Sequence, residues 1–146
     1  MQAFTYKKGE LHAESVALTA IAQQFGTPTY VYSRAHIEAQ YRSYTDGLQG
    51  VEHLVCFAVK ANSNIAVLNI LARLGAGFDI VSVGELERVL AAGGLPERMV
   101  FSGVGKTREE MQRALEVGVH CFNVESVDEL DRLQDVAAQM DVMAPV

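Results

Sequence analysis

The chain has 146 residues, of which 49% are hydrophobic and 21% are charged, and its formal net charge is −6. This balance is typical of a folded domain with a buried core and excludes a disordered chain. The 12 basic residues form no stripe, which argues against nucleic acid as a partner, and no apolar run reaches the roughly 20 residues that span a bilayer. Charged side chains between residues 7 and 14 interrupt any secretory leader, so a cytoplasmic address is expected.

The first 32 residues form a segment of their own. It opens with the strand-like "AFTYKKGELH" and continues with a helix whose apolar face includes Leu18 and Ile21. Gly26 ends that helix, and the extended stretch "GTPTYVYS" follows. The pattern predicts a strand–helix–strand segment over residues 1–32.

From residue 33 to residue 146 the chain repeats a βα unit four times. The predicted strands are "HLVCFAVK", "FDIVSV", "MVFSG" and "VHCFNV". An amphipathic helix precedes the first strand and one follows each strand. Capping boxes at Thr107 and Ser126 open the last two helices. Strands that alternate with amphipathic helices in this way predict an α/β fold with a parallel sheet.

Two parallel architectures fit the repeat, a doubly wound open sheet and a (β/α)₈ barrel. A barrel needs about 250 residues, so this chain would supply only the first half of one. The final "MAPV" resembles the approach to another strand, and we expect the sequence to be truncated there.

Several motifs favour no chemistry of their own. The stretch "FSGVGKT" lies between a strand and a helix, as a phosphate-binding P-loop does, but Val100 stands where that motif requires glycine. Gly75 and Gly77 are interpreted as a helix terminator and a turn, because they precede a strand rather than follow one. The four histidines lack metal-ligand spacing, so no metal is expected. The two cysteines lie in apolar runs and are interpreted as small hydrophobic residues.

Lys60 is the most informative residue, because it ends an otherwise apolar strand. Strand alternation places Cys56, Ala58 and Lys60 on one face, which predicts a lysine that points into the interior of the sheet or the mouth of a barrel. Burial disfavours the ammonium form, and imine chemistry needs the uncharged amine. The alternative is a lysine that extends from the strand end into solvent. The pattern alone leaves both open.

Polar residues also follow the other predicted strands. Asp79 and Glu85 lie at and after the second strand, and Asn123 and Glu125 end the fourth. Because ligand sites of parallel α/β folds lie at the carboxyl ends of the strands, these side chains and Lys60 predict one site.

The stretch "FAVKANSN" resembles the cofactor-lysine motif of the fold-type III pyridoxal-phosphate decarboxylases, whose barrel is like that of alanine racemase. The segments "LARLGAGFDIVSVGELERVLAAGG", "MVFSGVGKTREEMQRALEVGV" and "FNVESVDELDRL" resemble the next three units of that family. The opening "GELHAESVALTAIAQQFGTPTYVYS" is most similar to the branch that acts on diaminopimelate. The resemblance covers essentially the whole chain.

The resemblance implies the first half of a pyridoxal 5'-phosphate-binding (β/α)₈ barrel, preceded by a segment that joins a β-domain in the whole protein. It implies that Lys60 is catalytic and binds the cofactor, and that Ala58 lies beside the cofactor. Asp79 and Glu85 match positions that line the active site in related decarboxylases. Lys106 matches a position that is often polar.

The implied reaction is decarboxylation of a small amino-acid substrate, meso-2,6-diaminopimelate, to L-lysine and CO₂. The resemblance also implies that the whole protein is a homodimer. An ornithine- or arginine-type decarboxylase and a non-catalytic regulatory relative are the alternatives, although retention of Lys60 argues against the second. Residues 1–146 are expected to be inactive alone, because the family takes its phosphate-binding glycine loop from later strands.

Overall fold

The computed structural model describes residues 3–146, which divide into two compact units, one ending at Gln49 and the other spanning Gly50–Val146. The predicted boundary lay after residue 32, and helix α2 (Arg34–Gly47) falls within the first unit. The division into residues 1–32 and 33–146 therefore stays a prediction. No helix within residues 3–146 combines the length and the apolar character needed to cross a membrane.

The first unit contains an antiparallel sheet and two helices. Its strands are β1 (Phe4–Lys7), β2 (Glu10–Ala13) and β3 (Val16–Ala17), and its helices are α1 (Leu18–Phe25) and α2. The predicted single strand "AFTYKKGELH" is therefore a hairpin. Lys8 and Gly9 turn the chain with φ angles of 52° and 83°, the positive values that a tight hairpin turn favours.

The predicted second strand, "GTPTYVYS", is wrong, because residues 27–33 belong to no strand. Its alternation of residues suits a strand, but a strand must pair with a neighbour to satisfy its backbone groups. The described sheet of this unit uses the order β1-β2-β3. The short β3, which the sequence did not indicate, takes the second edge of β2.

Glu14 connects the hairpin to the start of α2. Its Oε1 accepts hydrogen bonds from the Ser33 hydroxyl at 2.7 Å and from the Ala35 N–H at 2.9 Å. Ser33 is the N-cap of α2 and accepts a hydrogen bond from the His36 N–H. The Ala35 N–H, and next the Ser33 hydroxyl, favour the ionised carboxyl and lower the pKa of Glu14.

This contact predicts a pH dependence of stability. Because the pKa of Glu14 is lowered on folding, its contribution is present above about pH 4.5 and is lost as the pH falls through the lower folded-state value. We expect thermal melts between pH 3 and pH 7 to show a smaller pH dependence for Glu14→Gln than for the wild type. Glu52→Gln is the control, since Glu52 is exposed. Equal slopes for Glu14→Gln and the wild type would contradict the role of Glu14.

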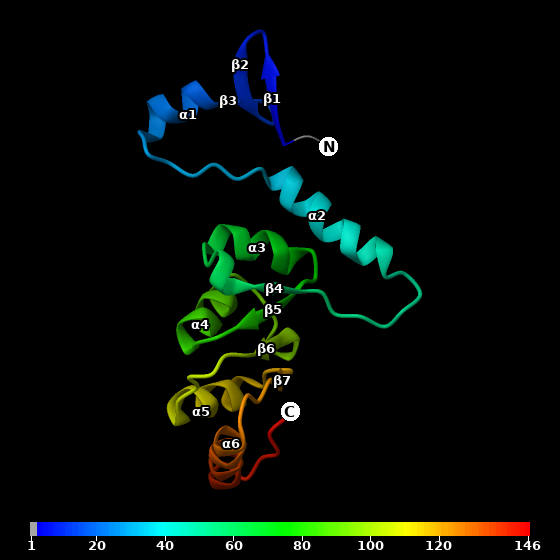
Figure 1. The fold of residues 1–146 in the computed structure, drawn as a ribbon, viewed down its shortest axis with the longest axis vertical. Helices are drawn as coiled ribbons and strands as arrows, with labels where there is room; N and C mark the ends of the chain where they lie inside the picture. Colours follow the sequence, from blue (N-terminus) through cyan, green and yellow to red (C-terminus); the bar gives the residue numbers. More distant parts are fainter. Residues whose placement is uncertain (1–2) are drawn as a thin grey trace. The chain divides into compact units, whose positions relative to one another are not determined.

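The second unit confirms the four predicted βα repeats (Figure 1). Its parallel sheet has the order β4-β5-β6-β7. The strands are β4 (Cys56–Ala58), β5 (Gly77–Ile80), β6 (Met99–Phe101) and β7 (Cys121–Phe122). The helices are α3 (Ile65–Arg73), α4 (Val83–Ala91), α5 (Arg108–Val117) and α6 (Val127–Gln139), and two 3₁₀ turns are η1 (Val59–Ala61) and η2 (Pro96–Arg98). Sequence-adjacent strands that are also neighbours in space are typical of part of a (β/α)₈ barrel.

The core of this unit lies between the sheet and the helices that follow one another along it (Figure 1). Phe78, Met99, Phe101 and Phe122 are at most 1% exposed, and the rings of Phe101 and Phe122 stack with centroids 5.8 Å apart. Alternate residues such as Asp79 are only partly buried. These alternate residues line the face that a barrel would enclose.

Glycine is required at positions 75 and 77, near the start of β5, for different reasons. Gly75 ends α3 with a φ of 82°, as predicted for a helix terminator. The interpretation of Gly77 as a turn is wrong, because it is the first residue of β5. A Cβ at Gly77 would lie 2.6 Å from Cys56 Sγ and 2.8 Å from the Arg98 carbonyl oxygen. Close approach of neighbouring chain segments therefore requires glycine there.

Candidate active site

The carboxyl ends of the parallel strands bring most of the predicted site residues to one edge of the sheet. Ala58 and Asp79 are register partners in β4 and β5. Lys60 follows β4 in turn η1, and Asn123 follows β7 directly. This edge is where α/β proteins with parallel strands place their ligands.

Lys60 itself does not have the predicted setting. β4 ends at Ala58, and the chain then turns through η1, so strand alternation does not extend to Lys60. Val59 takes the fully buried position, and Lys60 is exposed among residues 3–146, where the sheet has four parallel strands. Burial of Lys60 inside a closed barrel stays a prediction. Within residues 3–146, no hydrogen bond or ion pair engages the Lys60 amine. The amine is therefore available to a ligand.

Asp79 belongs to a hydrogen-bonded chain that crosses three strands. The Ser102 hydroxyl donates to Asp79 Oδ1, and Asn123 Nδ2 donates to Ser102 Oγ at 3.0 Å. The predicted site included Asp79 and Asn123 but missed Ser102. Its signal in the sequence is modest: it is the polar residue directly after an apolar strand, a position where Asn123 also stands.

Glu85 lies in the first turn of α4. Its Oε2 accepts a hydrogen bond from the Val81 N–H at 2.8 Å, and its own N–H donates to Ser82 Oγ at 3.3 Å. In this arrangement the carboxylate stabilises the start of the helix. A catalytic role of Glu85 stays a prediction, as does that of Glu125, which is exposed between β7 and α6.

The predicted capping boxes give different results. At Thr107 the box is complete. Glu110 also accepts a hydrogen bond from the Val83 N–H at 3.0 Å, which connects two successive βα repeats of the second unit. At Ser126 only the hydroxyl half forms, with the Glu129 N–H as donor. The Glu129 carboxylate accepts from Lys106 instead, because a buried ammonium is a stronger donor than a backbone N–H.

Lys106 is buried, with a side chain that is 0% exposed. Its Nζ donates to the Gly103 carbonyl at 2.6 Å, the Asn123 carbonyl at 2.8 Å and Glu129 Oε1 at 2.6 Å. An ammonium has three protons, and all three are used. Lys106 therefore cannot hold a phosphate as a P-loop lysine does, which agrees with the departure of "FSGVGKT" from that motif at Val100.

Lys106→Met is expected to lower the free energy of unfolding by about 3–5 kcal/mol, because Glu129 would be left as a buried charge without its partner. Urea titration followed by circular dichroism measures the loss. Arg113→Met is the matched control, since it breaks an ion pair of similar length, 2.7 Å to Glu87, in which both side chains are exposed. A loss for Lys106→Met no larger than for Arg113→Met would contradict the structural role of the buried pair.

Cys56 also lies on the face that carries Asp79. Burial, and next the negative charge of Asp79, raises the pKa of the Cys56 thiol. A raised pKa keeps the thiol protonated and unreactive, which supports the interpretation of Cys56 as a packing residue.

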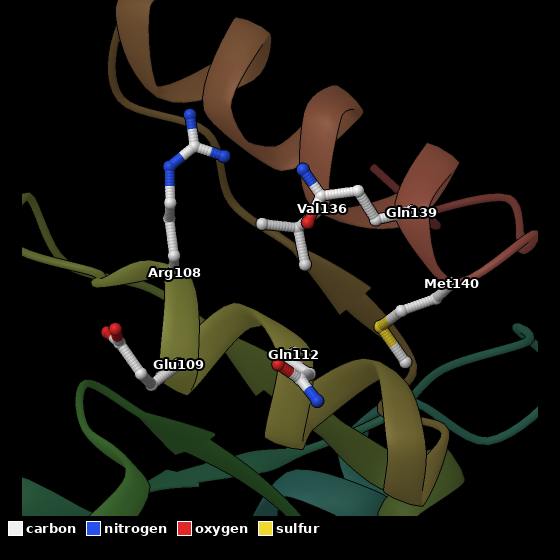
Figure 2. A pocket seen from close by; sticks show the side chains of 6 residues that line it. All are labelled: Arg108, Glu109, Gln112, Val136, Gln139 and Met140. Carbon is white, nitrogen blue, oxygen red and sulfur yellow. The ribbon is translucent and has the colours of Figure 1, made fainter.

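A surface pocket lies between α5 and α6 (Figure 2). It is lined by Arg108, Glu109, Gln112, Val136, Gln139 and Met140. None of the predicted site residues lines it. The pocket and the carboxyl edge are therefore separate features of the second unit.

A lysine amine that is available at the carboxyl edge of a parallel βα sheet defines an α/β protein able to hold a carbonyl-containing cofactor or substrate. The family model described as "Pyridoxal-dependent decarboxylase, pyridoxal binding domain" matches residues 34–146. The chain belongs to this family of pyridoxal-dependent decarboxylases.

Relatives and solved structures agree with the family and its fold. Diaminopimelate decarboxylase of Pseudomonas fluorescens is 75% identical over 147 residues, which are 100% of this chain and 35% of the relative. The structure of diaminopimelate decarboxylase from M. jannaschii with L-lysine has a TM-score of 0.94 at 33% identity, over 98% of this chain and 34% of that one. Lysine/ornithine decarboxylase from Vibrio vulnificus, with cadaverine, has a TM-score of 0.74 at 27% identity, over 86% and 33%. The chain thus spans about a third of the length of the relatives that it matches.

Proposed function

We propose that this chain forms part of a pyridoxal 5'-phosphate-dependent enzyme that decarboxylates meso-2,6-diaminopimelate to L-lysine and CO₂. One observation carries the proposal: of the two lysines that follow strands of the parallel sheet, only Lys60 has an amine without a partner among residues 3–146. Lys106 has used every proton. Lys60 is therefore the lysine that would hold the cofactor.

The residues around Lys60 fit this group. The cofactor's aldehyde needs a primary amine, which Lys60 offers in the turn after β4. Ala58, the register partner of Asp79, has only a methyl side chain and leaves room above the sheet. When bound, the cofactor provides an electron-accepting ring for the electrons left by departing CO₂. The chain's contribution is to hold the cofactor at Lys60 and to place the Asp79 carboxylate at the same edge.

The choice of substrate rests on the relatives. The 75% identical Pseudomonas fluorescens protein is named diaminopimelate decarboxylase, and the M. jannaschii structure holds L-lysine, the product of the proposed reaction. The lysine/ornithine decarboxylase is less similar in both sequence and structure. These differences favour diaminopimelate over ornithine or arginine.

Retention of Lys60 disfavours a non-catalytic regulatory relative. We also propose a homodimeric, cytoplasmic whole protein.

Steady-state assays test the substrate. The longer protein that carries this chain is expected to release CO₂ from meso-diaminopimelate with a kcat/KM at least about 100-fold above those for ornithine and arginine, because a site that pairs a second polar end of its substrate rejects molecules that lack it. Lys60→Ala should abolish turnover, while Lys8→Ala, which changes an exposed lysine of the hairpin turn, should not. Preferential turnover of ornithine or arginine would contradict the proposal that diaminopimelate is the substrate.

Residues 1–146 alone are expected to show no decarboxylation of diaminopimelate above background. Residues 3–146 contain four parallel strands, whereas a barrel of this kind has eight, so the face that carries Asp79 remains open to water. Measurable turnover by the purified 146-residue chain would show that the four strands are sufficient.

A further inference from the structure

We propose that Ser102 and Asn123 are positioning residues that hold the Asp79 carboxylate through a one-way chain of hydrogen bonds. The inference rests on the proposed function, in which Asp79 lies at the same edge as Lys60. It assigns a role to Ser102, which the sequence did not single out, and a specific one to Asn123.

The chemistry of the three groups sets the direction of the chain. Asn123 Nδ2 can only donate, so Ser102 Oγ must accept at their 3.0 Å contact. The single hydroxyl proton of Ser102 is then available for Asp79 Oδ1, which accepts it. Asp79 is the terminal acceptor, the role that an ionised carboxylate fills best.

The backbone holds Ser102 and Asn123 in place beyond the ends of their strands. The Ser102 N–H donates to the Ile80 carbonyl at 2.8 Å, and the Asn123 N–H donates to the Phe101 carbonyl at 3.0 Å. Each bond continues the parallel ladder by one residue. The polar side chains therefore extend from backbone that is as well fixed as the sheet itself.

Lys106 bonds to the backbone of the same two loops. Its buried ammonium donates to the carbonyl of Gly103, the residue after Ser102, and to the carbonyl of Asn123 itself. The third proton goes to Glu129 at the start of α6. One buried cation thus joins the two loops that carry Ser102 and Asn123, the donors of the hydrogen-bonded chain.

The consequence for the site lies in the second oxygen of Asp79. Oδ1 is engaged by Ser102, and no hydrogen bond to Oδ2 occurs within residues 3–146. With one oxygen held, the carboxylate cannot rotate freely and Oδ2 keeps one direction. That oxygen is the acceptor available to an amino group at the carboxyl edge, and its placement determines how well the amino group is oriented.

Variants of the longer protein test the positioning role. Ser102→Ala should lower kcat about tenfold while KM for diaminopimelate changes less than about twofold, since the loss is one of orientation. Ser102→Thr, which keeps the hydroxyl, should restore most of kcat. Asn123→Asp should lower kcat at least as much as Ser102→Ala, because the new carboxylate would compete for the Ser102 proton.

Ser126→Ala is the matched control, because it also removes a hydroxyl from a βα loop but one that caps α6 and does not contact Asp79. We expect it to leave kcat unchanged. A wild-type kcat for Ser102→Ala, an equal loss of kcat for Ser126→Ala, or a failure of folded Ser102→Thr to restore kcat would overturn the proposal.

A second measurement does not depend on activity. In protein labelled with ¹⁵N-asparagine, the Asn123 side-chain amide is the signal that disappears in Asn123→Asp. Ser102→Ala should shift this signal, and Ser102→Thr should return it toward its wild-type position. A shifted signal in a protein without decarboxylase activity would reject the proposed function and leave the hydrogen-bond chain standing. An unmoved signal in an active enzyme would reject the chain alone.

Discussion

The parallel register of β4 to β7 is the constraint on which the rest of the second unit depends. Because four consecutive strands run in the same direction as neighbours, every residue that follows a strand reaches the same edge. Lys60, Ser102 and Asn123 come together there although up to 63 positions separate them in the sequence, counting from 60 to 123. The helices lie along the sheet and bury its aromatic face, so the polar residues are left to the edge and to the opposite face.

The two lysines at the ends of strands show how differently the same side chain can be used. Lys106 is enclosed by three acceptors and has no proton to offer a ligand, so it serves the structure. Lys60 is exposed in a short turn and keeps its amine available. The availability of the amine is what makes Lys60, and not Lys106, the lysine proposed to hold the cofactor. Of the two, Lys106 has the sequence context that more closely resembles a known ligand-binding motif, the P-loop, but its contacts in the structure give it a structural role.

The repeat of strand and helix could be predicted because its signals are local. Apolar periodicity marks each helix, and caps such as Ser33 and Thr107 mark where helices begin. Strand ends were predicted less well, since an apolar run can continue after the ladder stops, as it does at Val59. The hairpin turn at Lys8 and Gly9 was missed because only glycine of the pair signals a positive φ.

The candidate site could be proposed only in part, again because only local signals are readable. Asp79 and Lys60 were proposed from strand position and from the family resemblance, whereas the partners of a side chain depend on tertiary contacts. Ser102 joins Asp79 only because β6 lies beside β5, and Glu129 turns from its own helix cap to Lys106 only because the two are buried together. No local pattern encodes either pairing.

The proposed function depends above all on Lys60 as the lysine that holds the cofactor. Borohydride reduction of the longer protein in the presence of pyridoxal 5'-phosphate, followed by digestion and mass spectrometry, identifies the lysine to which the cofactor is joined. We expect a pyridoxyl group on the peptide that contains Lys60, and none on Lys7, Lys8 or Lys106. A pyridoxyl group on any other lysine, or no modification at all, would contradict it.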